Sequence, residues 1–284
     1  MLNKRIMSSI FMLSIFLTTF FFLDVIFFEL LVIIVGGFLL FELSRILKLR
    51  GTNLILFWIV SLTPIVTNFI SSLIYYSSFF THPIFQSTLS MLSDIHNLFF
   101  WVIPASLIFW LIIVPADFLT KKISSNYLVN IFYGLFLVTP MLITILFIFR
   151  ENRDLLFIII SMIWVADIGA YFTGKKFGTI KLVKNISPGK TLEGLVGGFL
   201  FNMLFAIFLF LLGFINLVEG LLLSFLITAL SFYGDIYESF LKRKAGVKDS
   251  SSMIPGHGGF LDRLDSFCPT IPLLYIFLEV SEFF

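Results

Sequence analysis

The sequence predicts an all-α, polytopic integral membrane protein. Its mean hydropathy is +1.05 over 284 residues, only 13% of the residues are charged, and 39 are Phe. A soluble domain has about a quarter of its residues charged, so this composition excludes one. Apolar runs of roughly 17 to 25 residues, the length of a membrane-spanning helix, recur along the whole chain.

Nine such runs are expected to span the membrane. They lie near residues 6–22, 25–42, 54–77, 98–116, 127–149, 155–173, 192–216, 218–237 and 262–280. With the N-terminus in the cytosol and the C-terminus outside, every Lys and Arg except Arg150 and Arg153 falls on the cytosolic side, as the positive-inside rule expects. Residues 1–150 are expected to be scaffold helices, and residues 151–284 a catalytic region with a cytosolic-facing loop.

The sixth expected span contains an acidic residue deep within an apolar run. An ionised carboxylate there is costly unless it faces a partner or water, so Asp167 is interpreted as functional. Tyr171 follows four residues later on the same helix face and is expected to hydrogen-bond Asp167 or to line the same cavity. The alternative for Asp167 is a structural ion pair or an interhelical hydrogen bond.

Residues 174–191 are expected to form a loop that contains five lysines. Its end reads SPGKT, but we reject a P-loop because that motif's first glycine would fall on Lys184 and no strand is expected before it. Lys190 precedes the N-terminus of the next helix and is favoured as a phosphate contact. Lys175 and Lys176 fit equally well as cytosolic anchors.

The highest density of charge lies between Ser239 and Asp265, where a third of the residues are ionisable. Lys and Arg, which bind phosphate oxygens, occupy its start. Carboxylates, which hold Mg²⁺ and let it bridge to substrate phosphates, occupy its end. Glycines around His257 allow close backbone approach to a ligand. The segment therefore predicts phosphate chemistry with a bound metal at a membrane surface.

Three carboxylates are expected to converge there. Asp235 ends the eighth span, and Asp262 begins the ninth at the same membrane face, three residues before Asp265 on a shared helix face. Like charges this close require a neutralising cation, which predicts a Mg²⁺ site and is compatible with a second cation. Salt bridges to Arg243 and Arg263 are the structural alternative.

The pattern of this segment resembles the signature of phosphatidate cytidylyltransferases, also called CDP-diglyceride synthases. The matching positions are Ser239, Lys242, Arg243, Lys248, Asp249, Pro255, His257, Gly258, Gly259, Asp262, Arg263 and Asp265. A second similarity comprises Asp167, Ala170, Tyr171, the SPGKT run, Glu193 and Gly194. The resemblance is concentrated in the C-terminal part of the chain.

The resemblance implies a nucleotidyltransferase of phospholipid biosynthesis that converts CTP and phosphatidate into CDP-diacylglycerol and pyrophosphate. A phosphate monoester is largely dianionic at neutral pH, so the attacking oxygen needs no general base. In this reading Asp235, Asp262 and Asp265 hold Mg²⁺, and Lys190, Lys242, Arg243, Lys248 and Arg263 neutralise substrate phosphates. His257 contacts the nucleotide or the leaving group, and Asp167 and Tyr171 line the deeper wall of the pocket.

The expected partners are CTP, phosphatidate and the lipid bilayer, with a homodimer expected from the family and no nucleic acid. The expected location is the cell inner (plasma) membrane, with the active site facing the cytosol. A CTP-dependent enzyme acting on another lipid, such as a CDP-archaeol synthase or a polyprenol or phytol kinase, remains an alternative. A transporter is less favoured, because the sequence shows no internal repeat.

Overall fold

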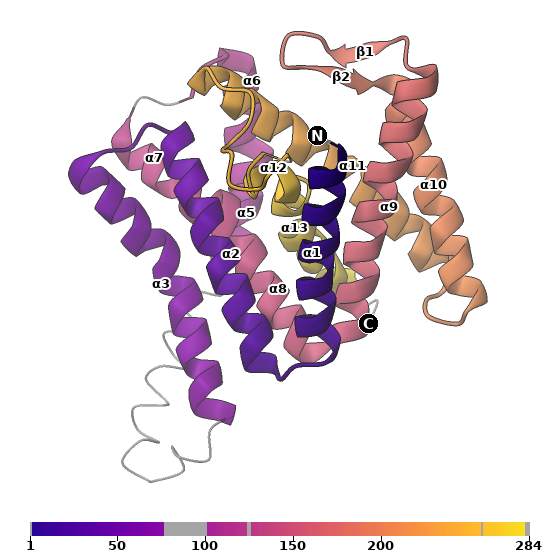
Figure 1. Ribbon diagram of the computed structural model, residues 1–284, viewed down its shortest axis with the longest axis horizontal. Helices are drawn as coiled ribbons and strands as arrows, with labels where there is room; N and C mark the ends of the chain where they lie inside the picture. Colours follow the sequence, from indigo (N-terminus) through magenta and orange to yellow (C-terminus); the bar gives the residue numbers. More distant parts are fainter. Residues whose placement is uncertain (1, 77–100, 124–125, 257, 282–284) are drawn as a thin grey trace. The chain divides into compact units, whose positions relative to one another are not determined.

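A computed structural model describes residues 2–76, 101–123, 126–256 and 258–281 (Figure 1). The chain divides into two compact units, which are described separately: unit 1 comprises Met1–Arg150 and Asp249–Arg263, and unit 2 comprises Glu151–Lys248 and Leu264–Phe284. Residues 249–263, which we call the signature segment, were assigned from the sequence to the C-terminal region. The structure groups them with the N-terminal helices instead.

The described residues of unit 1 are mainly helical, as Figure 1 shows. The helices are α1 Leu2–Phe21, α2 Val25–Ile46, α3 Gly51–Tyr76, α5 Val102–Ile108, η2 Phe109–Ile113, α6 Val114–Thr120, α7 Tyr127–Tyr133, η3 Gly134–Val138, α8 Thr139–Glu151 and the short α12 Leu261–Leu264. Aromatic rings join three of these helices, because Phe28 of α2 stacks on Phe149 of α8 at 3.9 Å and packs edge-on against Phe20 of α1. This contact forms part of the apolar core of the unit.

In the part of unit 1 that the structure describes, two π-helical turns interrupt the helices. The segment η2 ends at Ile113, two residues before Pro115, and η3 ends at Val138, two residues before Pro140. Proline lacks a backbone N–H and its ring collides with the carbonyl four residues earlier. A wider turn just before each proline accommodates both effects while the helix continues.

The described residues of unit 2 form four long helices and one small β-hairpin, as Figure 1 shows. These elements are α9 Arg153–Phe177, β1 Lys181–Val183, β2 Ser187–Thr191, α10 Leu192–Leu211, α11 Leu217–Ala245 and α13 Phe267–Ser281. The strands pair antiparallel, with Lys181 opposite Thr191 and Val183 opposite Ser187. Two sequence-based expectations were therefore wrong: residues 174–191 are not an irregular loop, and a strand does precede the SPGKT run, which itself forms β2.

Glycines allow α9 and α10 to pack closely. A methyl group on Gly194 would lie 3.0 Å from the carbonyl oxygen of Ala170, and one on Gly198 would lie 3.0 Å from that of Ala166. Small residues let helix backbones approach in this way inside a membrane. Gly194 and Gly198 therefore serve the packing of α10 against α9.

Seven helices in the described ranges are long and apolar enough to cross a membrane, so the chain is a helical membrane protein. They are Val25–Ile46, Gly51–Leu73, Val102–Thr120, Val129–Glu151, Arg153–Phe177, Leu192–Leu211 and Leu217–Ala245. The apolar part of α1, Met7–Phe21, is shorter. The expected ninth span is divided into α12, a two-residue turn and the 15-residue α13.

Candidate functional site

A polar cluster in unit 2 is built from two helices, the turn before α13 and the hairpin. Ser266 Oγ lies 2.8 Å from Asp235 Oδ1 on α11 and 3.1 Å from Asp167 Oδ2 on α9. Lys190, on β2, forms an ion pair with the other oxygen of Asp235. Asp235 is 8% exposed and Ser266 2% exposed. The structure therefore brings together three of the predicted residues, Asp167, Lys190 and Asp235.

Close packing of α11 against the start of α13 places Asp235 in this cluster. The preceding residue, Gly234, has no room for a side chain, because a methyl group there would contact the Asp265 carbonyl oxygen and lie 2.8 Å from Pro269 Cδ. One turn earlier on α11, Ser231 Oγ lies 3.4 Å from Thr270 Oγ1. The Asp265–Ser266 turn is thus held directly beside Asp235.

Lys190 is the counter-charge of this cluster. Burial lowers the pKa of Lys190 below its ordinary value, and the negative charges of Asp265 and Asp167 act in the opposite direction. The carboxylate of Asp235 pairs with it directly. A cation surrounded by carboxylates in this way holds them together at low dielectric, where an unpaired carboxylate would be costly.

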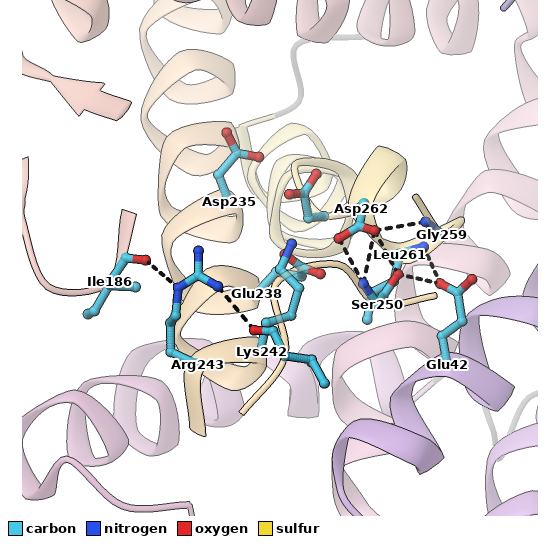
Figure 2. Close-up of polar contacts among 12 residues, drawn as sticks. Glu42, Ile186, Asp235, Glu238, Lys242, Arg243, Ser250, Gly259, Leu261 and Asp262 are labelled. Atoms are coloured by element: carbon cyan, nitrogen blue, oxygen red, sulfur yellow. Dashed lines mark hydrogen bonds and ion pairs between the residues drawn. The ribbon is translucent and has the colours of Figure 1, made fainter. Parts of the chain in front are cut away.

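Two further predicted cations of unit 2, Lys242 and Arg243, have protein partners. Lys242, on the last turns of α11, is buried and forms an ion pair with Glu238 one turn earlier. Arg243 donates from Nε to the Ile186 carbonyl in the hairpin turn at 3.2 Å and from Nη1 to the Val247 carbonyl at 3.0 Å (Figure 2). Arg243 therefore ties the hairpin to the end of α11. Lys248 is exposed.

Asp167 and Tyr171, which the sequence predicts to act together, have different environments. Asp167 accepts a hydrogen bond from Ser266 in the turn before α13, a contact between distant segments that resembles the structural alternative considered from the sequence. Tyr171 is 60% exposed, and the Nζ of Lys175 lies 5.6 Å above its ring.

The second polar cluster, in unit 1, is centred on the signature segment. Asp262 accepts hydrogen bonds at Oδ2 from the backbone N–H of Ser250 at 3.0 Å and of Gly259 at 2.8 Å (Figure 2). Ser250 Oγ lies 3.0 Å from the same oxygen. Asp262 therefore closes the segment on itself, whereas Arg263 is exposed. His257 lies outside the described residues.

Asp262 and Asp265 do not share a helix face as expected from their spacing. The helix α12 ends at Leu264, and Asp265 lies in the turn that follows, where its Oδ1 accepts from the N–H of Ser266 at 3.0 Å. The spacing rule fails because it assumes a continuous helix.

Two glycines of the signature segment, Gly258 and Gly259, leave room for the carboxylates of Asp262 and Glu42. Gly258 has φ of +89°, a conformation that favours glycine, and a methyl group there would lie 2.5 Å from Asp262 Oδ2. A methyl group on Gly259 would collide with Ser250 Oγ and with the carboxylate of Glu42.

Sequence reasoning missed Glu42, which belongs to the same cluster. It lies at the cytosolic end of the expected second span and is 0% exposed. The signal was present, since Glu42 is a carboxylate within an apolar run, as Asp167 is.

The metal ion implied by the sequence needs side chains that can coordinate it. Among the described residues, no three His, Cys, Asp or Glu side chains are close enough to hold a metal ion. The kind of donor nevertheless fits Mg²⁺, since Asp235 and Asp265 present carboxylate oxygens. Lys190 now supplies the positive charge beside Asp235.

The fold and these clusters define a polytopic helical membrane protein with buried carboxylates paired to cations. A model of the Cytidylyltransferase family matches residues 3–281, and the chain belongs to that family. This confirms the resemblance inferred from the charged segment.

Individual relatives are similar over part of the chain. They are the phosphatidate cytidylyltransferases of Haemophilus influenzae (44% identical over 130 residues, 43% of this chain and 45% of the relative), Synechocystis sp. (47% over 124 residues, 42% and 41%) and Bacillus subtilis (42% over 121 residues, 42% and 45%). In each comparison the chain spans less than half of the relative's length.

Proposed function

We propose that this protein is a phosphatidate cytidylyltransferase. The observation that carries the proposal is the family match over residues 3–281, joined by relatives that bear this name. An oxygen of the lipid phosphate forms a bond to the α-phosphorus of CTP, while the bond from that phosphorus to the bridging oxygen breaks and pyrophosphate leaves. The products are CDP-diacylglycerol and pyrophosphate.

Neutralising charge is the main demand of this reaction. Two anionic substrates must meet and a further anion must leave, so fixed cations act mainly through electrostatics and positioning. Lys190 and Lys242 are the cations proposed to meet substrate phosphates from within unit 2. Their present pairing with Asp235 and Glu238 supports this, because each lysine is held in place before a phosphate arrives.

The remaining basic residues are assigned from the family pattern. They are Arg243, Lys248 and Arg263, with His257 proposed to contact the nucleotide or pyrophosphate. For Arg243, the two bonds to backbone carbonyls support a second role in holding the hairpin that carries Lys190.

A divalent metal is the proposed cofactor. Asp235 and Asp265 would hold Mg²⁺, and the sequence pattern adds Asp262. When bound, Mg²⁺ neutralises the triphosphate and polarises the α-phosphorus. Ser266 would orient the carboxylate of Asp235 through the 2.8 Å contact to its Oδ1, and Asp167 would receive the second contact of the same hydroxyl.

The proposed membrane arrangement follows the distribution of charge. It has nine spans, a cytosolic N-terminus, an external C-terminus and an active site that faces the cytosol. In this arrangement Arg150 and Arg153 are the only Lys or Arg residues of the sequence outside the cell, as the positive-inside rule expects. At the cell inner membrane, phosphatidate would reach the site from the bilayer and CTP would reach it from the cytosol. A homodimer is proposed on the family resemblance alone.

Product analysis tests the activity. Purified protein in detergent is given CTP and phosphatidate, with Mg²⁺ or with EDTA, and both pyrophosphate and CDP-lipid are measured. We expect equal amounts of the two products, dependence on Mg²⁺, and loss of at least about 100-fold in Asp235→Asn. Glu219→Gln is the matched control, because Glu219 lies at the opposite end of α11 and bonds Asn216.

Three outcomes would contradict this proposal. Release of CDP with a newly phosphorylated lipid would indicate a kinase. Formation of a CDP-lipid only from an ether-linked or polyprenyl acceptor would indicate a different lipid substrate. Full activity of Asp235→Asn with EDTA present would refute the metal assignment.

A further inference from the structure

We propose that Glu42 is a positioning residue that holds the signature segment in its active shape. Its carboxylate lies on α2, more than 200 residues before the segment that it contacts. The inference rests on the proposed cytidylyltransferase function, because it assigns Glu42 a part in the same reaction. Glu42 itself is not proposed to touch substrate.

Within the described residues, the groups that hydrogen-bond Glu42 are all donors from the signature segment. Its Oε1 accepts from Ser251 Oγ at 2.6 Å and from the N–H of Phe260 at 3.0 Å. Its Oε2 accepts from Ser250 Oγ at 2.8 Å and from the N–H of Leu261 at 2.8 Å. Figure 2 shows the side chain pointing toward Ser250 and Leu261. One buried carboxylate thus fixes both ends of the segment.

The contacts lead directly to Asp262. The hydroxyl of Ser250 stands between the two carboxylates, 2.8 Å from Glu42 Oε2 and 3.0 Å from Asp262 Oδ2. The backbone N–H groups of Phe260 and Leu261, which bond Glu42, belong to the turn on which Asp262 stands. The position of Asp262 therefore depends on Glu42 through two separate routes.

An aromatic contact reinforces this anchor. Phe38, one turn before Glu42 on α2, stacks on Phe260 with ring centroids 4.9 Å apart and ring planes 8° from parallel. The absence of a side chain at Gly259 leaves room for the Glu42 carboxylate. Together these contacts seat the signature segment on one face of α2.

The chemistry requires a carboxylate at position 42. An ionised carboxylate only accepts hydrogen bonds, and the four recorded partners all donate. A glutamine of the same shape would turn its NH₂ group toward two of those donors. Glu42→Gln therefore removes the anchor while keeping the volume of the side chain.

A second buried acid on α2 provides a matched control. Glu29 is also 0% exposed, but it pairs with Arg150 of α8 and accepts from Ser72 of α3. Glu29→Gln thus changes an equally buried acid of the same helix whose hydrogen-bond partners, among the described residues, lie on α3 and α8 and not in the signature segment. Ser72→Ala is a milder version of that control if Glu29→Gln folds poorly.

The test compares backbone amide exchange with turnover. Hydrogen exchange of residues 249–263 is measured in detergent for the wild type, Glu42→Gln and Glu29→Gln, alongside kcat and KM for CTP per folded molecule. We expect Glu42→Gln to speed exchange at residues 259–262 and to lower kcat at least about tenfold, with KM for CTP changed less than about threefold. Glu29→Gln should leave exchange in this segment and kcat within about twofold of wild type.

A graded variant extends the test. Ser251→Ala removes one donor and leaves the carboxylate with three, so its effects on exchange and kcat should be smaller than those of Glu42→Gln. Unchanged exchange at residues 259–262 in folded Glu42→Gln, or an unchanged kcat, would overturn the proposal. Equal losses in Glu42→Gln and Glu29→Gln would also overturn it, because general destabilisation would then suffice.

The exchange experiment needs no turnover, so the two proposals fail separately. A wild-type protein that makes no CDP-lipid would refute the proposed function. Protection of residues 259–262 that depends on Glu42 would still show that this residue holds the segment, whereas its independence from Glu42 would refute the anchor whatever reaction the protein catalyses.

Discussion

Lys190 is subject to two opposing effects on its charge. In the proposed reaction it must be protonated, both to neutralise the carboxylates of the cluster and to meet a substrate phosphate. Burial favours its neutral form and lowers its pKa, while the nearby carboxylates favour the charged form. An incoming phosphate adds negative charge and stabilises the protonated lysine further.

Replacing Lys190 tests this balance. Lys190→Met leaves Asp235 without its ion-pair partner, so we expect the free energy of unfolding to fall by about 2 kcal/mol, between the values for exposed and buried pairs. Turnover should fall at least about 100-fold. Thermal unfolding and CDP-lipid formation measure the two effects.

The control for this substitution is Lys184→Met in the exposed hairpin turn. It should leave both quantities nearly unchanged. A Lys190→Met variant with wild-type turnover would exclude Lys190 from phosphate binding.

Position 259 requires glycine because neighbouring side chains leave no room for a larger residue. A methyl group there would collide with Ser250 and Glu42. We expect Gly259→Ala to cost about 1 to 3 kcal/mol, as overpacking does, and to lower activity by displacing the signature segment.

Gly189→Ala is the comparison for Gly259→Ala, since nothing lies within 4 Å of the added methyl group. Chemical or thermal unfolding in detergent gives the difference. Equal behaviour of the two variants would mean that the signature segment adjusts freely.

At the scale of elements, the contact between α9 and α10 depends on small residues. Gly194 and Gly198 face backbone carbonyls of α9, so a larger residue must separate the two helices. Separation would also displace β2, which runs directly into α10 and carries Lys190.

Gly198→Leu tests that contact. We expect a loss of about 1 to 3 kcal/mol in stability from overpacking, together with reduced turnover. The control is Gly37→Leu on α2, where an added methyl group meets nothing within 4 Å. Comparable loss in both variants would show that any leucine in a span is harmful, against this packing argument.

At the scale of the whole molecule, the proposed topology can be tested by labelling. Cys268 is the single cysteine of the chain and is buried, so new surface cysteines report clearly. We expect Asn152→Cys to react with an impermeant maleimide added outside intact cells, and Lys184→Cys to react only after the cells are opened. The reverse pattern would invert the proposed orientation.

The sequence singled out residues that the structure brings together, because charge is costly in an apolar chain. Asp167, Lys190 and Asp235 were each singled out by position alone, and the structure gathers them around Ser266. The family was predicted from the charged segment, and the family match confirms it. The approximate helix positions also followed, since hydropathy alone determines which stretches can be buried in lipid.

Other features required the tertiary structure. The hairpin of residues 181–191 was missed because its strands are short and lysine-rich, and they form by pairing with one another. The break between Asp262 and Asp265 was missed because a helical spacing rule cannot detect a turn. The role of Glu42 could not be predicted because its partners lie more than 200 residues away.

The sequence by itself determined that this is a helical membrane protein of the Cytidylyltransferase family, because composition and local motifs depend on neighbouring residues alone. Only the tertiary structure decided which charges are paired, that Ser266 joins Asp167 to Asp235, and that a carboxylate of α2 holds the signature segment. Buried polar groups must find partners, and which partners they find depends on how distant segments pack.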